Sequence, residues 1–273
     1  MSLDLKPAVD KILSMSPKRP RIGLVLGSGL GPVVDAIENQ IVLDYNQIPG
    51  FKKTSVEGHS GSLIRGTISG VEVAVMQGRV HFYEGHTLDE VVFPARVMAS
   101  LNLDALILTN ASGGINSKYR PGEIVMIKDH INLTGNNPLI GPNKNEWGPR
   151  FPDMTYAYNP EIRAQFQNVA KQLKIDLKEG NYVGVSGPTY ETPAEINMFR
   201  IVGGDMVGMS TVPEVIAAHH MGAKVAALSC VSNMAAGMTS DKLDHDDIKD
   251  VALLGVETMK KLLIGFIEQL GKK

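Results

Sequence analysis

Residues 21–31 read RIGLVLGSGLG. The first six residues, 21–26, form a short and mostly apolar run, and three glycines at positions 27, 29 and 31 follow it directly. Such a run, ending in a glycine-rich turn, is typical of a buried strand that enters a tight loop. The same arrangement recurs at residues 105–114, ALILTNASGG. The chain is therefore predicted to build a sheet with loops at the ends of its strands.

Other parts of the chain carry the patterns of strands and hairpins. Residues 62–68 and 71–77 flank Ser69-Gly70, which is typical of a tight connection between antiparallel strands. Along 71–77, valines alternate with other residues, so one face of that strand is expected to be buried. Further short apolar runs predict strands at residues 125–127, 182–185 and 225–228.

Helix starts are marked by capping boxes, in which a hydroxyl and a carboxylate three residues later satisfy backbone N–H groups at the helix end. Asn159-Pro160 predicts another helix start, and an apolar stripe predicts a last helix from about Asp246. Alternating strands and helices, with a hairpin among them, indicate an α/β fold around a mixed sheet. The capping boxes are Thr87 with Glu90, Thr192 with Glu195, and Thr211 with Glu214.

The composition limits the class of protein. The 273 residues, 43% of them hydrophobic, suffice for one α/β domain over residues 1–273. Charged residues make up 21% and the net charge is -2, so neither nucleic acid nor a membrane is an expected partner. Cys230 is the only cysteine and is read as a core residue. No signal peptide or membrane span is recognised, and a cytoplasmic location is expected.

The turn Gly27-Ser28-Gly29-Leu30-Gly31 is a candidate anion site. Glycines let backbone N–H groups approach an anion, and a helix predicted to begin after the turn would add a favourable dipole. A dinucleotide fingerprint would require a third glycine where Pro32 stands, and the lysine of a P-loop is absent. For this motif taken alone, a plain tight turn is an equal alternative.

Two further strand ends carry groups that suit a phosphate. Arg79 can bind phosphate through two hydrogen bonds, and His81 points the same way in an extended segment. Glu84 can fix the tautomer of a nearby histidine. A surface Arg–Glu pair or structural histidines are the alternative. The small residues at 110–114 leave backbone N–H groups accessible to an anion, although a glycine turn also explains them.

A second group of residues suits a heteroaromatic ligand. Glu191 precedes a helix cap and is not needed for the capping box, so its carboxylate can accept from a ligand N–H. Tyr190 can face a planar ring, and the amide of Asn233 can donate and accept at once. For Asn233 a turn role is the alternative. Ser210 offers an anion a hydroxyl before another helix. No spaced set of metal ligands is apparent.

Five segments, in order, closely resemble the trimeric, low-molecular-mass class of purine nucleoside phosphorylases: GLVLGSGLG (23–31), GRVHFYEGH (78–86), LTNASGGIN (108–116), GPTYETPAE (187–195) and VGMSTVPEVIAAHH (207–220). The resemblance extends from about Arg21 to His245. It implies a single-domain α/β fold whose mixed sheet is partly closed into a barrel and flanked by helices. It also implies a homotrimer with sites near subunit interfaces, and phosphate as a co-substrate without cofactor or metal.

The resemblance implies a role for each matching residue. Phosphate would be bound by Ser28, His59, Arg79, His81, Ala111 (through its backbone) and Ser210. The purine would be held by Glu191 and Asn233 and lined by Tyr190, Val207 and Met209. Ribose would contact Tyr83, Met209 and His245. Trp147 stands where the family often has a phenylalanine that reaches the neighbouring subunit's site. The expected catalytic residues are Asn233, His81 and Glu191.

The implied reaction is phosphorolysis of inosine, guanosine and their 2′-deoxy forms to free purine and (deoxy)ribose 1-phosphate, a step of purine salvage. The related 5′-methylthioadenosine phosphorylases are an alternative, but they tend to carry Asp at the position of Asn233 and a small apolar group in place of His245. A non-catalytic nucleoside- or phosphate-binding protein is a further alternative. It would not need Asn233 and Glu191 beside a complete anion site.

Overall fold

In the residues that the structure describes, the fold is built on one mixed sheet of nine strands. The computed structural model describes residues 4–54, 60–239 and 245–272, and for residues 245–254 it describes the backbone but not the side chains. The strands of the sheet follow the order β2-β3-β4-β1-β5-β8-β7-β6-β9. Their bounds are β1 (Ile22–Leu26), β2 (Glu38–Asp44), β3 (Ser62–Ile68), β4 (Val71–Gln77), β5 (Ala105–Gly114), β6 (Ile124–Asn132), β7 (Lys178–Gly184), β8 (Met206–Gly208) and β9 (Val225–Met234).

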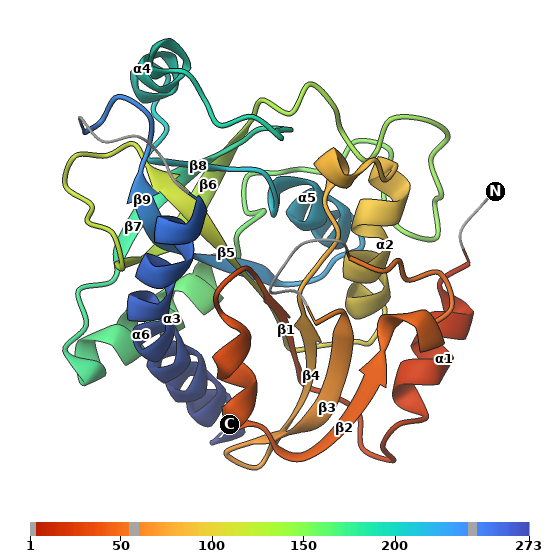
Figure 1. Ribbon diagram of the computed structural model, residues 1–273. Coiled ribbons are helices and arrows are strands. Elements are labelled where there is room, and N and C mark those ends of the chain that lie inside the picture. The colour runs from red at the N-terminus through yellow and green to blue at the C-terminus, as the bar shows by residue number, and fades with distance from the viewer. Residues whose placement is uncertain (1–3, 55–59, 240–244, 273) are drawn as a thin grey trace.

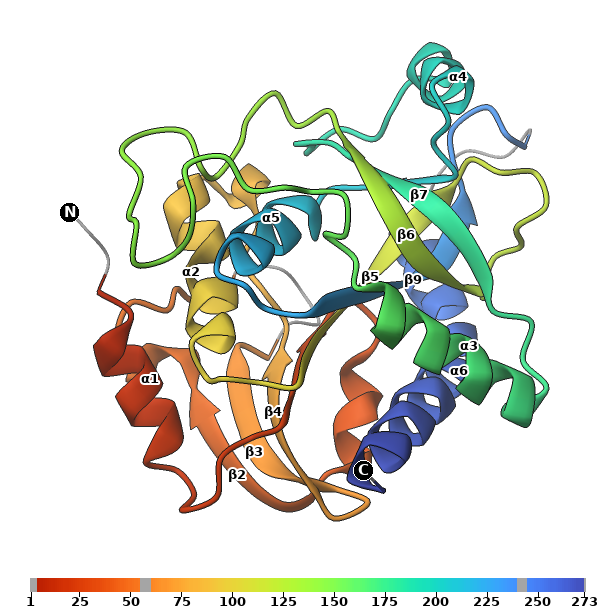
Figure 2. The same cartoon turned by 180° about the vertical axis from the view of Figure 1, so that it is seen from behind.

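Helices cover both faces of this sheet (Figures 1 and 2). The α-helices are α1 (Lys6–Leu13), α2 (Leu88–Ala99), α3 (Pro160–Leu173), α4 (Pro193–Ile201), α5 (Val212–His220) and α6 (His245–Gly271), and short 3-10 helices occur at η1 (Gly31–Ala36), η2 (Tyr45–Gln47) and η3 (Phe82–Glu84). Helices α3 and α6 pack against each other through stacked Phe166 and Phe266, whose ring centroids are 4.3 Å apart. None of the helices in the described ranges is long and apolar enough to cross a bilayer.

Half of the sheet closes on itself. Strand β5 pairs with β8 at one edge and also with β9, so β5, β8, β7, β6 and β9 form a closed ring of strands. The other strands extend from β1, which pairs in parallel with β4 and β5. Parallel and antiparallel pairs are both present, as in the antiparallel β3–β4 pair. The predicted α/β fold with a mixed sheet partly closed into a barrel is confirmed.

The predicted hairpin between β3 and β4 is confirmed in detail. Ser69 and Gly70 have φ angles of 50° and 77°, the left-handed values that a two-residue turn of the common hairpin type requires at both positions. One face of β4 carries Val73 and Val75, which belong to the core beneath α6. Ala74 and Met76 face the core on the opposite side, toward α1 and α2. Both faces of β4 are therefore buried, where the alternation predicted one.

Strands β5, β6, β7 and β9 are longer than predicted, and the extensions of β5 and β9 reach the site. Strand β5 continues from the expected end at residue 109 to Gly114, and β9 continues from residue 228 to Met234. The residues 110–114 are thus not a loop, and Asn233 lies within a strand. Closure of the barrel explains the difference, because Gly113 pairs with Asn233 on one side and with Val207 on the other.

The helix predicted after the glycine-rich turn that follows β1 is η1, a 3-10 helix of six residues. Pro32 in its first turn has no backbone N–H to offer an anion. The three capping boxes, the helix start at Asn159-Pro160 and the last helix are confirmed. Helix α1 and strands β2 and β8 had no predicted counterpart.

Candidate active site

An open cavity of about 790 Å³ lies at the carboxyl ends of β1, β4 and β5 and beside β8 and β9. Ligands of α/β proteins commonly bind at this end of the strands. Most of the predicted site residues line it: Ser28, Arg79, His81, Tyr83, Ala111, Tyr190, Glu191, Val207, Met209, Ser210 and Asn233.

Arg79 is held at the end of β4 by two other segments. It is 4% exposed, its Nη1 donates to the carbonyl of Thr109 at 2.8 Å, and its Nε donates to the Glu214 carboxylate at 3.0 Å. Gly27 makes this approach possible, because a Cβ there would lie 2.7 Å from the Thr109 carbonyl oxygen and 3.1 Å from Nη1 of Arg79. Glycine at position 27 therefore brings the turn that carries Ser28 against Arg79.

His81 is oriented by Glu84, and it is thus the nearby histidine whose tautomer Glu84 was expected to fix. The Nδ1 atom of His81 lies 3.0 Å from Oε1 of Glu84, which also accepts the His81 backbone N–H at 2.7 Å. Tyr83 stacks on the imidazole with ring centroids 4.8 Å apart and planes at 13°. Burial raises the pKa of Tyr83 to about 12, so its hydroxyl stays neutral at physiological pH. The pairing makes Nδ1 the donor to Glu84 and fixes the ring plane.

Ser210 lies between β8 and α5, on a sharp reversal of the chain. The next residue, Thr211, has φ 71° and ψ -52°, and the Val212 N–H donates back to the Ser210 carbonyl at 2.7 Å. This is a γ-turn of the rare kind with positive φ. Ser210 thus stands at the cavity wall beside the start of α5, together with Arg79 and His81.

The lining of the cavity also includes a carboxylate and an amide. Glu191 precedes the N-cap of α4, and Asn233 lies on β9 beside Gly113. Burial raises the pKa of the Glu191 carboxyl, with a smaller contribution from the nearby Glu195 carboxylate. Tyr190, at 43% exposure, stands at the rim, and Val207 and Met209 complete the lining.

Sequence reasoning missed a buried chain of polar side chains beneath the cavity. Asn110 Nδ2 donates to Thr211 Oγ1 at 2.7 Å, and Asn110 Oδ1 accepts from Ser229 Oγ at 2.6 Å. Ser229 in turn contacts Ser112 Oγ at 2.6 Å, and Ser232 Oγ donates to the Ser112 carbonyl at 3.2 Å. The only sign of this polar chain in the sequence was the presence of serine and asparagine in the otherwise apolar strands β5 and β9. The chain joins the strand ends at Ser210 and Asn233.

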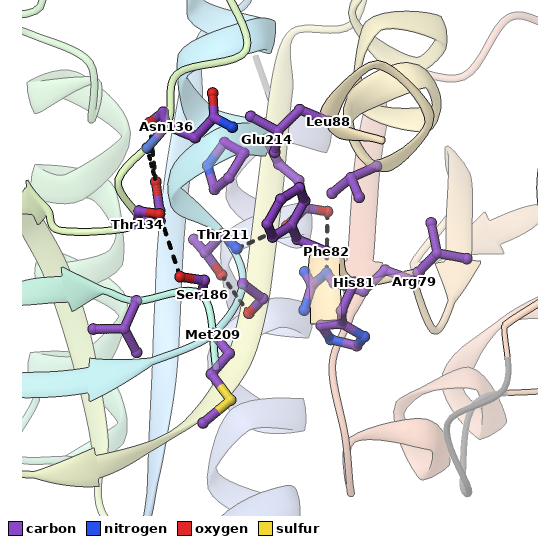
Figure 3. Close-up of a pocket in the computed structure, with 15 residues that line it drawn as sticks. Arg79, His81, Phe82, Leu88, Thr134, Asn136, Ser186, Met209, Thr211 and Glu214 are labelled. Atoms are coloured by element: carbon purple, nitrogen blue, oxygen red, sulfur yellow. Dashed lines mark hydrogen bonds and ion pairs between the residues drawn. The ribbon is translucent and has the colours of Figure 1, made fainter. Parts of the chain in front are cut away.

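A narrower pocket of about 420 Å³ adjoins the cavity and shares Arg79, His81, Met209 and Ser210 with it (Figure 3). Its walls are mainly apolar and include Leu88 and Val91 of α2 and Val185 after β7. In Figure 3, Glu214 reaches across this pocket to Arg79 from α5. Glu214 was predicted only as a capping residue.

Three predicted site residues are not among the described residues that line this cavity. His59 lies outside the described residues, and for His245 the structure describes the start of α6 but not the side chain. Trp147 lies in the long segment between β6 and α3, sandwiched between the Arg96 guanidinium at 4.3 Å and the Lys144 ammonium at 3.8 Å from its ring centroid. Its predicted contact with a neighbouring subunit stays a prediction.

Cys230 is fully buried in β9, and burial raises the pKa of its thiol to about 12. A neutral, inaccessible thiol is unreactive, so the core role predicted for Cys230 is confirmed. Over the described ranges, no three His, Cys, Asp or Glu side chains are grouped as a metal site would require.

Known proteins of one family are similar to this chain in sequence and in structure. The family model described as the phosphorylase superfamily matches residues 21–268. Purine nucleoside phosphorylase 1 of Bacillus subtilis is 50% identical over 252 residues, covering 92% of this chain and 90% of the relative. The rat purine nucleoside phosphorylase is 41% identical over 264 residues, with 95% and 91% covered. The structure of Schistosoma mansoni purine nucleoside phosphorylase with inosine superposes with a TM-score of 0.91 at 39% identity, covering 97% and 95%.

Proposed function

The chain belongs to the phosphorylase superfamily and, within it, to the purine nucleoside phosphorylases, and from this premise we propose that it splits inosine, guanosine and their 2′-deoxy forms with inorganic phosphate. One observation carries the proposal. A single cavity is lined both by anion-binding groups and by an amide and a carboxylate. A nucleoside phosphorylase needs both, because phosphate and purine must meet on opposite sides of one ribose.

The phosphate wall consists of Ser28, Arg79, His81, the Ala111 backbone and Ser210. Two donors of Arg79 are already fixed to Glu214 and the Thr109 carbonyl, which sets the plane of its guanidinium. A planar guanidinium binds the oxygens of phosphate with defined geometry. The wall places the phosphate beneath the anomeric carbon, so that a phosphate oxygen attacks from the face opposite the base. His59, outside the described residues, is a further proposed phosphate ligand.

The purine wall consists of Asn233 and Glu191, with Tyr190, Val207 and Met209 against the ring. The Glu191 carboxylate accepts from N1–H of a 6-oxopurine, and the Asn233 amide donates to N7. Adenine has no N1–H, which leaves the Glu191 carboxylate without its donor. An unmet buried acceptor costs ~1–3 kcal/mol, which favours inosine and guanosine over adenosine.

The reaction passes through a transition state with positive charge on the ribosyl ring and negative charge on the departing purine. The phosphate anion stabilises the ribosyl charge, and the Asn233 amide stabilises the charge that develops at N7. The glycosidic C–N bond breaks and a C–O bond forms to hydrogen phosphate. The proton that hydrogen phosphate loses is the one that the free purine carries on its imidazole ring, so the step balances without any other reactant. Phosphate is a co-substrate, and the proposed reaction uses no cofactor and no covalent enzyme intermediate.

The ribose is assigned to Tyr83 and Met209, with His245 near its 5′-hydroxyl, and we propose that the enzyme works in purine salvage as a cytoplasmic homotrimer. Exposed apolar side chains in the segment between β6 and α3 support subunit contact there, since Phe151 is 87% exposed, Ile140 is 74% exposed and Tyr156 is 66% exposed. Trp147 belongs to the same segment and is the residue proposed to reach the neighbouring site.

A panel of nucleosides tests the substrate class. Purified protein is incubated with inosine, guanosine, adenosine or 5′-methylthioadenosine at saturating phosphate, and free base is quantified. The proposal expects inosine and guanosine to react with a kcat/KM well above that of the two adenine nucleosides. Turnover of methylthioadenosine without inosine or guanosine cleavage would assign the chain to the related phosphorylases instead. Binding without release of any base would indicate a non-catalytic protein.

Asn233→Asp is expected to shift preference toward adenosine. An aspartate can accept from the exocyclic amino group of adenine, whereas for a 6-oxopurine it brings a carboxylate close to the 6-oxygen. The ratio of kcat/KM for adenosine to that for inosine is expected to rise roughly 5- to 150-fold, which corresponds to ~1–3 kcal/mol of transition-state free energy. The measurement is that ratio at saturating phosphate. An unchanged ratio would show that position 233 does not contact the base edge.

The raised pKa of Glu191 predicts the pH dependence of base binding. Burial raises its pKa, and only the ionised carboxylate accepts N1–H without competing for a proton. Inosine affinity is therefore expected to fall as the pH drops through the pKa of Glu191, which lies above the pKa of an ordinary glutamate. Measuring the inosine Kd without phosphate excludes titration of phosphate itself. Glu191→Gln should bind inosine more weakly but lack this acid limb, and an identical limb in both proteins would contradict the assignment.

A further inference from the structure

Glu214 is a buried carboxylate that joins two segments of the phosphate wall. It is 3% exposed, its Oε1 accepts from Arg79 Nε at 3.0 Å, and its Oε2 accepts from the Thr211 N–H at 3.0 Å (Figure 3). The first segment is the end of β4, and the second is the turn that carries Ser210. A single side chain therefore sets the distance between the Arg79 guanidinium and the backbone next to Ser210.

The capping role alone does not explain this burial. The same motif occurs at Thr87 with Glu90 and at Thr192 with Glu195, where both capping hydrogen bonds are exposed. Capping works at the surface, and burying a carboxylate is unfavourable unless a partner compensates it. At Glu214 the partner is Arg79, itself 4% exposed. The capping box of Thr211 and Glu214 therefore has a role beyond helix capping, which the two exposed boxes lack.

The turn that Glu214 holds is strained. Thr211 is β-branched and has φ 71°, a value that such residues rarely adopt. Strained residues persist where neighbours over-determine them, and they cluster at functional sites. Here the Thr211 N–H donates to Glu214 and its Oγ1 accepts from Asn110 Nδ2 at 2.7 Å. The strain keeps Ser210 at the cavity wall, because the chain reverses between β8 and α5 within these residues.

We propose that Glu214 is a positioning residue for phosphate, which acts by holding Arg79 and the Thr211 turn in one arrangement. This inference rests on the proposed function, since it assigns phosphate to the wall that Glu214 organises. It also makes the wall close to neutral before phosphate arrives, because the Glu214 carboxylate balances the Arg79 charge. Phosphate is then held by the geometry of its donors more than by net charge.

Two substitutions separate positioning from charge. Glu214→Gln keeps the shape but presents only one acceptor, so either Arg79 Nε or the Thr211 N–H loses its partner. Glu214→Asp keeps the charge that compensates buried Arg79, which protects the fold, but is one methylene too short to span both donors. If Glu214 positions the wall, both variants bind phosphate more weakly. If it only neutralises Arg79, the Gln variant binds phosphate more tightly and the Asp variant is unchanged.

The experiment measures KM for phosphate and for inosine, each at saturation with the other, and the Kd of inorganic phosphate by calorimetry. The phosphate KM of both variants is expected to rise roughly 10- to 100-fold, with the inosine KM within about 2-fold of the wild-type value. In the double variant Arg79→Lys with Glu214→Gln, the phosphate KM is expected to rise by less than the product of the fold-increases in the two single variants. Lysine has no Nε for Glu214 to hold, so the second substitution removes an interaction that the first has already broken.

Glu72→Gln is the matched control. Glu72 lies 3.6 Å from the fully buried Arg65 on the β3–β4 hairpin, far from the cavity, so its loss is expected to lower stability while leaving the phosphate KM unchanged. A phosphate KM for both Glu214 variants equal to the wild-type value would overturn the inference and leave the proposed function standing. A wild-type protein without phosphate-dependent turnover would instead overturn the proposed function.

Discussion

Arg79→Ala is expected to lower kcat/KM for phosphate by roughly 10²- to 10⁴-fold. Arg79 provides charge-assisted hydrogen bonds to phosphate, and each such bond contributes about 1.5–3 kcal/mol, so the loss of two gives this range. The inosine KM at saturating phosphate is expected to change far less. The measurement is the initial rate over a phosphate series at fixed, saturating inosine.

The same substitution tests the buried ion pair. Removing Arg79 leaves the Glu214 carboxylate, 3% exposed, without its partner, and an uncompensated buried charge costs about 3–5 kcal/mol of stability. Arg79→Ala is therefore expected to unfold at lower denaturant concentration than the wild type. Arg79→Lys serves as the control, because it retains a charge but not the planar fork. Full activity of the lysine variant would contradict the proposed geometry at the phosphate wall.

Asn233→Ala is expected to lower kcat for inosine by about 10²- to 10³-fold, or ~2.7–4 kcal/mol, the usual effect of removing one donor from a developing negative charge. The charge on N7 is small in the bound nucleoside and large in the transition state. The loss should therefore appear in kcat more than in KM. Both constants are measured with inosine at saturating phosphate.

A modified substrate provides the control for Asn233. A purine nucleoside methylated at N7 carries a positive charge on its imidazole ring, leaves without any donor at N7, and cannot accept from Asn233. The variant and the wild type are expected to cleave it at similar rates. A variant that is equally impaired on both substrates would show that Asn233 has a structural role and not the proposed one. Asn233 pairs with Gly113 between β9 and β5, and the substitution is expected to leave this backbone pairing in place.

Much of the site was predictable because its residues lie in short, contiguous segments. Ser28 and Arg79 follow β1 and β4, which are parallel strands, so their carboxyl ends lie at the same edge of the sheet. Ser210 was predicted from its place before a helix, and it follows β8, which is antiparallel to β5. The capping boxes marked the helices that start beside this edge. The pairing of His81 with Glu84 needed only a spacing of three residues, and the structure has it at 3.0 Å.

Features that depend on closure of the barrel were not predictable. Residues 110–114 have the composition of a loop, and they become strand because β8 and β9 supply hydrogen-bond partners from about 90 to 120 residues away in sequence. The γ-turn at Thr211 has no sequence signature, since a β-branched residue is disfavoured there. Glu214 looked like a capping residue because its second partner, Arg79, comes from a distant segment.

The central claim is that phosphate, and not water, cleaves the nucleoside. The most direct measurement is the product balance from inosine with and without inorganic phosphate. With phosphate, hypoxanthine and ribose 1-phosphate are expected in equal amounts, with phosphate consumed one for one, and without phosphate no hypoxanthine is expected. Hypoxanthine released with free ribose, at a rate independent of phosphate, would contradict the account.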